Sequence, residues 1–384
     1  MKTEQIYEIM NDVTTEVLEG VTIQEDLKNI VEVGEAVFNA NAYEKYTKAL
    51  VNRIGKTIFV NRAYKGGVPS VLMDAWEYGS VLQKVDCDIP EAQENESWNL
   101  ENGVSYDPNI FKAPTINVRF WNNQVTFEIQ MSFVEKQIRQ SFLNVSELNS
   151  FISMIYNAIE KSMTIKLDKL ISMTIANAIG ETIYNEYNDP NDYTTKSGVR
   201  AVNLLYLYNQ TVATPITKSE ALQDIEFLKF ASKTIALYTE YLQKISKLFN
   251  IGGRPRFTPS DLMHIVLLSE FAKASDVYLQ SSVYHNEMVK LPQYESVAYW
   301  QSSGTKFEFD DVSKINITTA QNHSITIDGV LGVIFDRDML GVCNYDRRTT
   351  SDYNARAEFV NMWFKTEARY FNSFDENCVV FFIQ

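Results

Sequence analysis

The chain has 384 residues, of which 45% are hydrophobic and 22% charged, and its formal net charge is -14. This length can bury a substantial core and allows two or three domains. The acidic balance argues against wrapping a phosphate backbone, which needs clustered Lys and Arg. It suits a protein whose copies stay apart until a specific contact forms between them.

The ends and cysteines of the chain indicate an intracellular origin. The N-terminal stretch "MKTEQIYEIMNDVTTEVLEG" lacks a basic region followed by an apolar core, so we expect no signal peptide. Apolar runs such as "HIVLL" and "VVFFI" are far shorter than the ~18 residues of a membrane span. Cys87, Cys343 and Cys378 are widely separated and odd in number, which predicts neither disulfides nor a zinc site but a reducing cytoplasm.

The first part of the chain is predicted to be a helical arm. Residues 1 to about 35 are polar, acidic and weakly periodic, and "AVFNANAYEKYTKALVNRIGKTIF" carries apolar residues at helical spacing. The segment "KGGVPS" then breaks the helix. We therefore assign residues 1–55 to an N-terminal helical arm.

Two alternating segments flank a long polar connection. Residues 81–89 alternate apolar and charged side chains, and residues 115–120 alternate again, which predicts two strands. The connection between them, about residues 90–114, is too long for a compact domain and indicates a binding arm. We predict an extended two-stranded arm whose apolar side chains are buried on another molecule. These contact candidates are Trp98, Leu100, Tyr106, Ile110 and Phe111.

A strand and a very long helix follow. Residues 125–133 alternate strictly between apolar and polar side chains. Residues 146–179 carry one apolar stripe, with Ser146 placed to cap the start and Gly180 placed as a left-handed cap at the end. A helix of that length is roughly 50 Å long at ~1.5 Å per residue. The stripe consists of Leu148, Phe151, Ile152, Ile155, Ile159, Met163, Leu167, Leu170, Ile171, Ile175, Ala178 and Ile179.

The second half of the chain predicts a mixed helix and strand block. A capping box at Thr217 and Glu220 predicts a second long helix that reaches about Phe249. The segment "HIVLLS" reads as a buried strand that leads into a helix, and "SVAYWQ", "KFEFDD", "KINITTA" and "SITIDGVLGVIF" read as short strands. The alternating stretch 360–370 and the final "CVVFFI" predict a C-terminal hairpin.

Motifs of catalysis and metal binding are missing from the sequence. His264, His285 and His323 stand in unrelated contexts, and "IGGRP" has neither phosphate-loop nor dinucleotide spacing. The acidic cluster at 186–192 lacks the glycine and closing glutamate of a calcium loop. We expect no catalytic residue, no cofactor and no metal, and hence no enzyme.

The order of these elements resembles that of the Hong Kong 97-type major capsid proteins of tailed bacteriophages. The resemblance rests on "LVNRIGKTIFVNRAYKGGVPSVLMDAWEYGSVLQKV" before the arm, "HIVLLSEFAKASDVYLQSSVYHNEMVKLP" with "VAYWQ", and the stretch from "GVLGVIFDRDML" to "CVVFFI". It implies an α+β fold with an N-terminal arm, an extended loop, a peripheral domain with a long spine helix and a narrow antiparallel sheet, and an axial domain.

The resemblance also divides the chain. It implies an extended loop at 56–124 with its tip at about 90–114, a peripheral domain at 125–200 and an axial domain at 201–345. Residues 346–384 return to the peripheral domain and close it with the C-terminal hairpin.

A shell function follows from the same resemblance. Pentamers and hexamers of the chain would enclose the double-stranded DNA of a tailed phage in an icosahedral or prolate head, assembled in the bacterial cytoplasm. Its partners would be other copies of itself and the portal protein, together with scaffolding, head-completion or decoration proteins. The packaged DNA would be bound only non-specifically, and no membrane would be involved.

Three alternatives remain open at this stage. An encapsulin-like protein compartment would have the same architecture with a protein cargo, and an unrelated enzyme with a long helix would need the catalytic motifs that the sequence lacks. Some branches of the resembled family weld their subunits by a Lys–Asn bond that a buried Glu promotes. The residues available here for that chemistry are Lys84, Lys112, Asn361, Asn372, Asn377 and Glu367.

Overall fold

The structure is a computed structural model in two compact units. One unit comprises residues 1–75, 124–171 and 342–370, and the other comprises residues 76–123, 172–341 and 371–384. The structure describes residues 11, 14–15, 71–73, 82–90, 92, 94, 101–103, 109, 111, 113–134, 145–187, 192–282, 293–300, 309–318, 324–357 and 359–384. The predicted helical arm at 1–55 thus lies almost entirely outside the described residues.

The first unit contains a four-stranded sheet in the order β1-β11-β12-β4. Strand β12 pairs antiparallel with β4, from Phe359 opposite Val134 to Arg369 opposite Gln124. The strands predicted at 125–133 and 360–370 are therefore confirmed as partners in one sheet. The bounds are β1 (Leu72–Met73), β4 (Gln124–Val134), β11 (Leu340–Asn354) and β12 (Phe359–Asn372).

The long helix is present and longer than predicted. Helix α5 spans Val145–Tyr187, so its predicted end at residue 179 is wrong. Gly180 lies inside the helix instead of capping it. The Ile317 side chain packs closely over it, since a Cβ added at Gly180 would come within 2.7 Å of Ile317 Cδ1. The apolar stripe is confirmed wherever its side chains are described, because all of these are buried: Ile159, Met163, Leu167, Leu170, Ile171, Ile175, Ala178 and Ile179.

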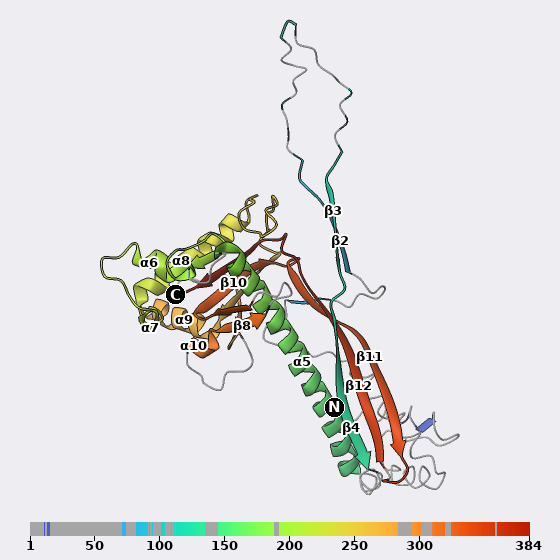
Figure 1. Ribbon diagram of the computed structural model, residues 1–384. Coiled ribbons are helices and arrows are strands. Elements are labelled where there is room, and N and C mark those ends of the chain that lie inside the picture. The colour runs from blue at the N-terminus through green and yellow to red at the C-terminus, as the bar shows by residue number, and fades with distance from the viewer. Residues whose placement is uncertain are drawn as a thin grey trace. The chain divides into compact units, whose positions relative to one another are not determined.

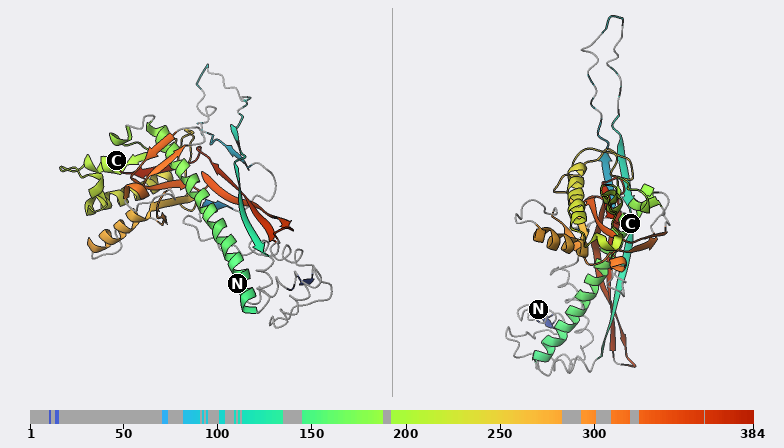
Figure 2. Two further views of the ribbon diagram at one scale, coloured as in Figure 1. Left: turned by 60° about the horizontal axis from the view of Figure 1, so that its bottom comes forward. Right: turned by 90° about the vertical axis from the view of Figure 1, so that its left-hand side faces the viewer.

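Within the first unit, the helix stripe packs on one face of the sheet. Side chains of β12 alternate between buried and half-exposed, and the buried ones include Val360, Met362 and Phe364. Thr366 Oγ1 on this face donates a hydrogen bond of 3.3 Å to Met163 Sδ on α5. Figure 1 and Figure 2 show this part of the helix running alongside β4 and β12. The period-two strand and the helix stripe therefore bury each other.

The second unit is built on a five-stranded sheet in the order β5-β13-β10-β6-β7. Strand β10 is antiparallel to both β13 and β6, whereas β5 and β7 run parallel to their neighbours. The bounds are β5 (Ala201–Asn203), β6 (Met263–Leu268), β7 (Glu295–Val297), β10 (Val330–Asp336) and β13 (Cys378–Phe382).

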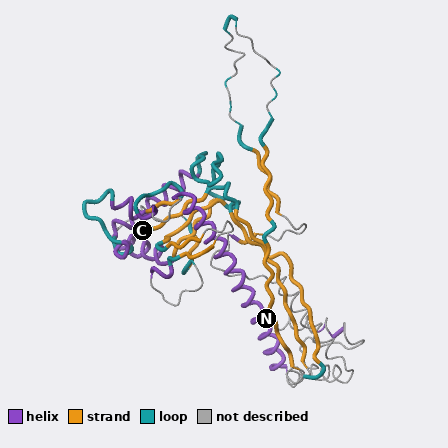
Figure 3. Tube along the Cα trace, in the orientation of Figure 1, coloured by secondary structure: helices purple, strands orange, loops and turns teal. Residues whose placement is uncertain are grey.

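Helices lie along this sheet (Figure 3), and their side chains supply much of its core. Phe227 of α8, Phe271 of α9 and Phe381 of β13 are fully buried members of one apolar cluster. The remaining elements of the second unit are η3 (Asp192–Thr194), α6 (Leu204–Asn209), α7 (Lys218–Ala221), α8 (Ile225–Leu242), α9 (Ser269–Ser282), α10 (Phe309–Val312), β8 (Ile315–Thr318) and β9 (Ser324–Ile327). In the described part of the chain, no helix is long and apolar enough to cross a membrane.

The second predicted helix is interrupted. Glu220 accepts a hydrogen bond of 2.9 Å from the Thr217 main-chain nitrogen, as the capping box predicts, but α7 ends at Ala221. Asp224 then caps a new helix, because its Oδ1 accepts from Phe227 N at 2.6 Å. Helix α8 ends at Leu242 rather than near Phe249. A second capping side chain within the apolar pattern thus divides the helix.

Two strand predictions in the C-terminal part are wrong. The predicted C-terminal hairpin does not form, because β13 pairs with β10 and β5 while β12 belongs to the other sheet. All five residues of β13 are buried, as expected for a strand covered on both faces, whereas β12 alternates. The segment "KFEFDD" contains the start of the short helix α10 instead of a strand.

The core of the second unit yields a stability prediction. Replacing fully buried Phe381 with Ala should lower the free energy of unfolding by about 3–5 kcal/mol, because it removes apolar contacts and leaves a cavity. Phe257→Ala is the matched control, since that ring is 50% exposed, and it should cost less than ~1 kcal/mol. Urea denaturation of the purified chain measures both values, and equal losses would contradict this assignment of the core.

Candidate functional site: the arm ladder and its anchor

The base of the predicted arm is an antiparallel pair of strands, which we call the arm ladder. It consists of β2 (Leu82–Cys87) and β3 (Ile116–Trp121). Leu82 lies opposite Trp121, and Cys87 lies opposite Ile116. Figure 1 and Figure 3 show the two strands side by side. The two alternating segments found in the sequence are thus confirmed as paired strands.

The arm ladder buries its charged face and exposes its apolar face. On β2, Lys84 and Asp86 are half-buried while Val85 and Cys87 are exposed. The exposed fraction is 57% for Val85 and 62% for Phe120 on the opposite strand. Alternation in the sequence shows only that the two faces differ. A strand usually turns its apolar face inward, but in the arm ladder the charged face is turned inward and the apolar face outward.

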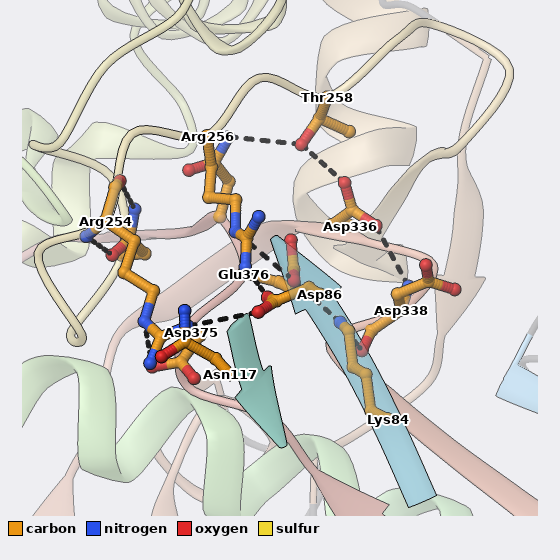
Figure 4. A network of polar contacts seen from close by, with 12 residues as sticks. Lys84, Asp86, Asn117, Arg254, Arg256, Thr258, Asp336, Asp338, Asp375 and Glu376 are labelled. Carbon is orange, nitrogen blue, oxygen red and sulfur yellow. Dashed lines mark hydrogen bonds and ion pairs between the residues drawn. The ribbon is translucent and has the colours of Figure 1, made fainter. Parts of the chain in front are cut away.

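Lys84 anchors the inner face to the turn before β13. Its Nζ lies 2.6 Å from Glu376 Oε1, and it also donates to the main-chain oxygen of Asp338 at 3.5 Å (Figure 4). The Glu376 side chain is only 10% exposed. A charged hydrogen bond in such a site is stronger than one at the surface, because little water competes for it.

Two arginines pair with Asp86, the acidic residue of β2. Arg254 Nη1 donates to Asp86 Oδ1 at 3.2 Å, and Arg256 makes an ion pair with the same carboxylate. On β3, Arg119 donates to Asp375 Oδ1 at 2.6 Å. The Asp375 side chain is 4% exposed, so its charge depends on these cations for compensation.

A layer of hydrogen bonds around Asp336 continues this anchor. Thr258 Oγ1 donates to Asp336 Oδ2 at 2.7 Å, and Asn377 Nδ2 donates to Thr258 Oγ1 at 3.1 Å. Burial raises the pKa of Asp336, while hydrogen bonds from Asp338 and Thr258 oppose that rise. We call the ion pairs of Lys84, Asp86, Arg119, Arg254, Arg256, Asp375 and Glu376, with this layer, the anchor.

One aromatic contact completes the inner attachment. Trp121 Nε1 donates to the Asn372 main-chain oxygen at 3.1 Å, and its ring centroid lies 5.2 Å from that of Phe371. Trp121 belongs to the same face of the arm ladder as Lys84 and Asp86, since the register pairs it with Leu82. The inner face is therefore fixed along both strands.

The predicted contact residues are only partly placed. Trp98, Leu100, Tyr106 and Ile110 lie outside the described residues. Phe111 is described, and 88% of its side chain is exposed. These five remain candidates for contact between subunits.

Of the residues considered for a covalent crosslink, Lys112 lies outside the described residues, and Glu367 makes an ion pair of 3.5 Å with Arg369. The other four also have partners within the chain. Lys84 is ion-paired with Glu376, and Asn361 accepts a hydrogen bond from Ser132 at 2.6 Å. Asn372 Nδ2 donates to the Thr174 main-chain oxygen at 3.2 Å, and Asn377 donates to Thr258. These contacts give each of them a role in stabilising the fold.

Comparison with known families assigns the chain. It matches the model of the Phi29-like phage major capsid protein over residues 7–382. The chain belongs to this family. It is therefore a phage head-shell protein, and the encapsulin-like alternative is not favoured.

Solved capsid structures resemble this capsid protein at low sequence identity. The capsid of Staphylococcus phage Andhra has 11% identity and a TM-score of 0.48, with 85% of this chain and 86% of that chain covered. The mature capsid of bacteriophage PhiM1 has 10% identity and a TM-score of 0.45, with coverages of 84% and 89%. The capsid of cyanophage P-SCSP1u has 11% identity and a TM-score of 0.45, with coverages of 82% and 86%. None of the curated proteins compared with the chain matches it.

Metal ligation has no support among the described residues, where no group of three or more His, Cys, Asp or Glu side chains could hold an ion.

The anchor could not be predicted from the sequence because its members lie up to about 290 positions apart, between Lys84 and Glu376. The alternating charges of β2 were visible, but no local signal identified their partners.

The buried end of the anchor predicts a loss of stability in this capsid protein. Asp375→Ala should lower the free energy of unfolding by about 3 kcal/mol, because Arg119 and Arg254 lose a buried carboxylate. Asp192→Ala is the matched control, since its ion pair with Lys196 is exposed, and it should cost less than ~1 kcal/mol. Denaturant unfolding of the two purified variants compares them, and a neutral Asp375→Ala would contradict a structural role for the anchor.

Thiol chemistry tests the orientation of the arm ladder. Cys87 is exposed, whereas Cys343 and Cys378 are buried, and burial raises the pKa of the Cys378 thiol to about 12. A maleimide at pH 8 should therefore modify Cys87 rapidly in the native subunit and the other two only after unfolding. Mass spectrometry of labelled peptides distinguishes them, and protection of Cys87 in the free subunit would contradict its outward placement.

Proposed function

We propose that this capsid protein builds the head by the Hong Kong 97-type plan, in which pentamers and hexamers of one chain close into an icosahedral or prolate shell around double-stranded DNA. The peripheral domain would contain α5 and the four-stranded sheet, and the axial domain would contain the five-stranded sheet. The family assignment supports this plan. The main observation in favour of this plan is the exposed arm. A shell subunit needs a surface that is buried only when it contacts a neighbouring subunit.

The arm supplies that surface in our proposal. All described positions between residues 90 and 115 are exposed, including Phe111 at 88%. We assign Trp98, Leu100, Tyr106, Ile110 and Phe111 to the contact with a neighbouring copy. Burying a large apolar side chain contributes about 1.5–3 kcal/mol, and a closed shell repeats that gain at each copy.

The charge of the arm indicates which surface of the neighbouring copy it contacts in our proposal. Residues 90–114 contain five acidic residues and one lysine, a net charge of -4. The outer side of α5 presents exposed Lys161, Lys166 and Lys169 around Ile165, which is 54% exposed. An acidic, aromatic arm is complementary to a basic helix face that also carries an apolar side chain.

The remaining partners follow from the same plan. The portal protein and scaffolding, head-completion or decoration proteins would contact the shell during its assembly in the bacterial cytoplasm. The packaged DNA would touch it only non-specifically, because the chain is acidic overall. A structural role of this kind requires no catalytic step.

Assembly of the purified chain tests the function directly. Negative-stain microscopy should show closed shells or capsomer rings above a critical concentration. Phe111→Ser should raise that concentration about tenfold, which corresponds to about 1.4 kcal/mol for one lost apolar contact per copy. Phe111→Tyr is the matched control and should assemble like the wild type, because it keeps the ring.

A chain that stays monomeric and small under all assembly conditions would contradict the proposed function. Shells that form equally well with Phe111→Ser would contradict only the assignment of Phe111 to the contact.

A further inference from the structure

The outward face of the arm ladder is an apolar surface that the chain does not use for its own core. Cys87 also belongs to this face, with Gln83 at its end. Its apolar side chains are Val85 at 57%, Ile89 at 47%, Ile116 at 61%, Val118 at 45% and Phe120 at 62% exposed.

The arm ladder cannot turn this face inward without breaking the anchor. Lys84 is fixed to Glu376, Asp86 to two arginines, and Arg119 to Asp375. Reversal of the arm ladder would leave these largely buried charges unpaired, which is strongly unfavourable. The anchor therefore holds the apolar face outward in every copy.

An exposed apolar face of this kind is expected to be covered by another molecule. A two-stranded ribbon is only marginally stable by itself, and an exposed apolar strand pair promotes association. This face carries no charged side chain, so it cannot bind the phosphates of a nucleic acid. It requires a partner that contributes apolar side chains.

We infer that the outward face of the arm ladder is a second interface between copies of this chain, separate from the tip of the arm. Three observations select a second copy as the occupant. The chain belongs to a family whose members form shells from repeated copies. The face is continuous, through Ile89 and Ile116, with the exposed arm segment that we assign to a neighbour. At a net charge of -14, copies repel one another, so an uncharged apolar face is a place where close approach meets little repulsion.

This inference rests on the proposed function, because it requires a shell, and it adds a role for the anchor. The anchor residues act as positioning residues: they touch no neighbour themselves but set which face of the arm ladder is presented. In the proposed shell this contact is heterologous, with the face of one copy against a different surface of the next, because contacts of that kind close into rings.

Cys87 provides the test, because it lies on this face opposite Ile116, at the end of the arm ladder that continues into the arm, and is the exposed one of the three cysteines. The measurement is the rate of maleimide labelling at Cys87 in free subunits and in shells assembled from the purified chain alone. We expect rapid labelling in free subunits and at least tenfold slower labelling in shells. Gentle dissociation of the same shells should restore the rapid rate.

A pair of variants tests the face without relying on the thiol. Val118→Ser combined with Phe120→Ser should leave the unfolding temperature of the free subunit unchanged, because both side chains are already exposed. It should raise the critical concentration for assembly at least tenfold. Gln83→Ser is the matched control, since Gln83 lies on the same face opposite Phe120, and it should assemble normally.

The outcomes separate the inference from the proposed function. Shells in which Cys87 reacts as fast as in free subunits would overturn the inference and leave the proposed function standing. Protection of Cys87 already in the free subunit would also overturn it, because the occupant would then be the chain itself. Absence of any shell from the wild-type chain would overturn the proposed function and the inference together.

Discussion

The ion pairs between the arm ladder and the rest of its own unit determine which face of the arm ladder is exposed. Four cations and three carboxylates meet there, and Asp375 is almost completely buried among them. Apolar packing is tolerant of sliding and rotation, whereas charged hydrogen bonds fix both distance and direction. A joint of this kind suits an arm that must leave the body at a defined angle and still present apolar side chains to a neighbour.

Folding of the subunit and association of its copies thereby depend on two separate sets of surfaces. Stability of the subunit comes from the helix stripe on the narrow sheet and from the phenylalanine-rich core of the five-stranded sheet. In our proposal, association comes from apolar surface that is exposed in the subunit, on the arm ladder and at Phe111. Because these surfaces are separate, contacts between copies can be strengthened or weakened with little effect on folding.

Much of the fold could be predicted from local patterns, and the errors have identifiable physical causes. The stripe from Ile159 to Ile179 and the alternation at 125–133 located β4 and all of α5 except its C-terminal end, because both depend on which side of an element is buried. Gly180 was misread because a helix interior also accepts glycine where Ile317 approaches closely. The partners of β13 and of Lys84 are contacts between distant residues, and one sequence carries no signal for them. The apolar contact residues of the arm were selected by composition, which cannot say what covers them.

The most direct measurement of the central claim is a cryo-electron microscopy reconstruction of the assembled shell at a resolution that shows side chains. In that map Lys84, Asp86 and Arg119 should keep their partners within the same chain, while Val118 and Phe120 should lie within van der Waals distance of a neighbouring copy. A map in which these two side chains face solvent, or in which the arm ladder has released Glu376 and Asp375 to pair with another chain, would contradict that claim.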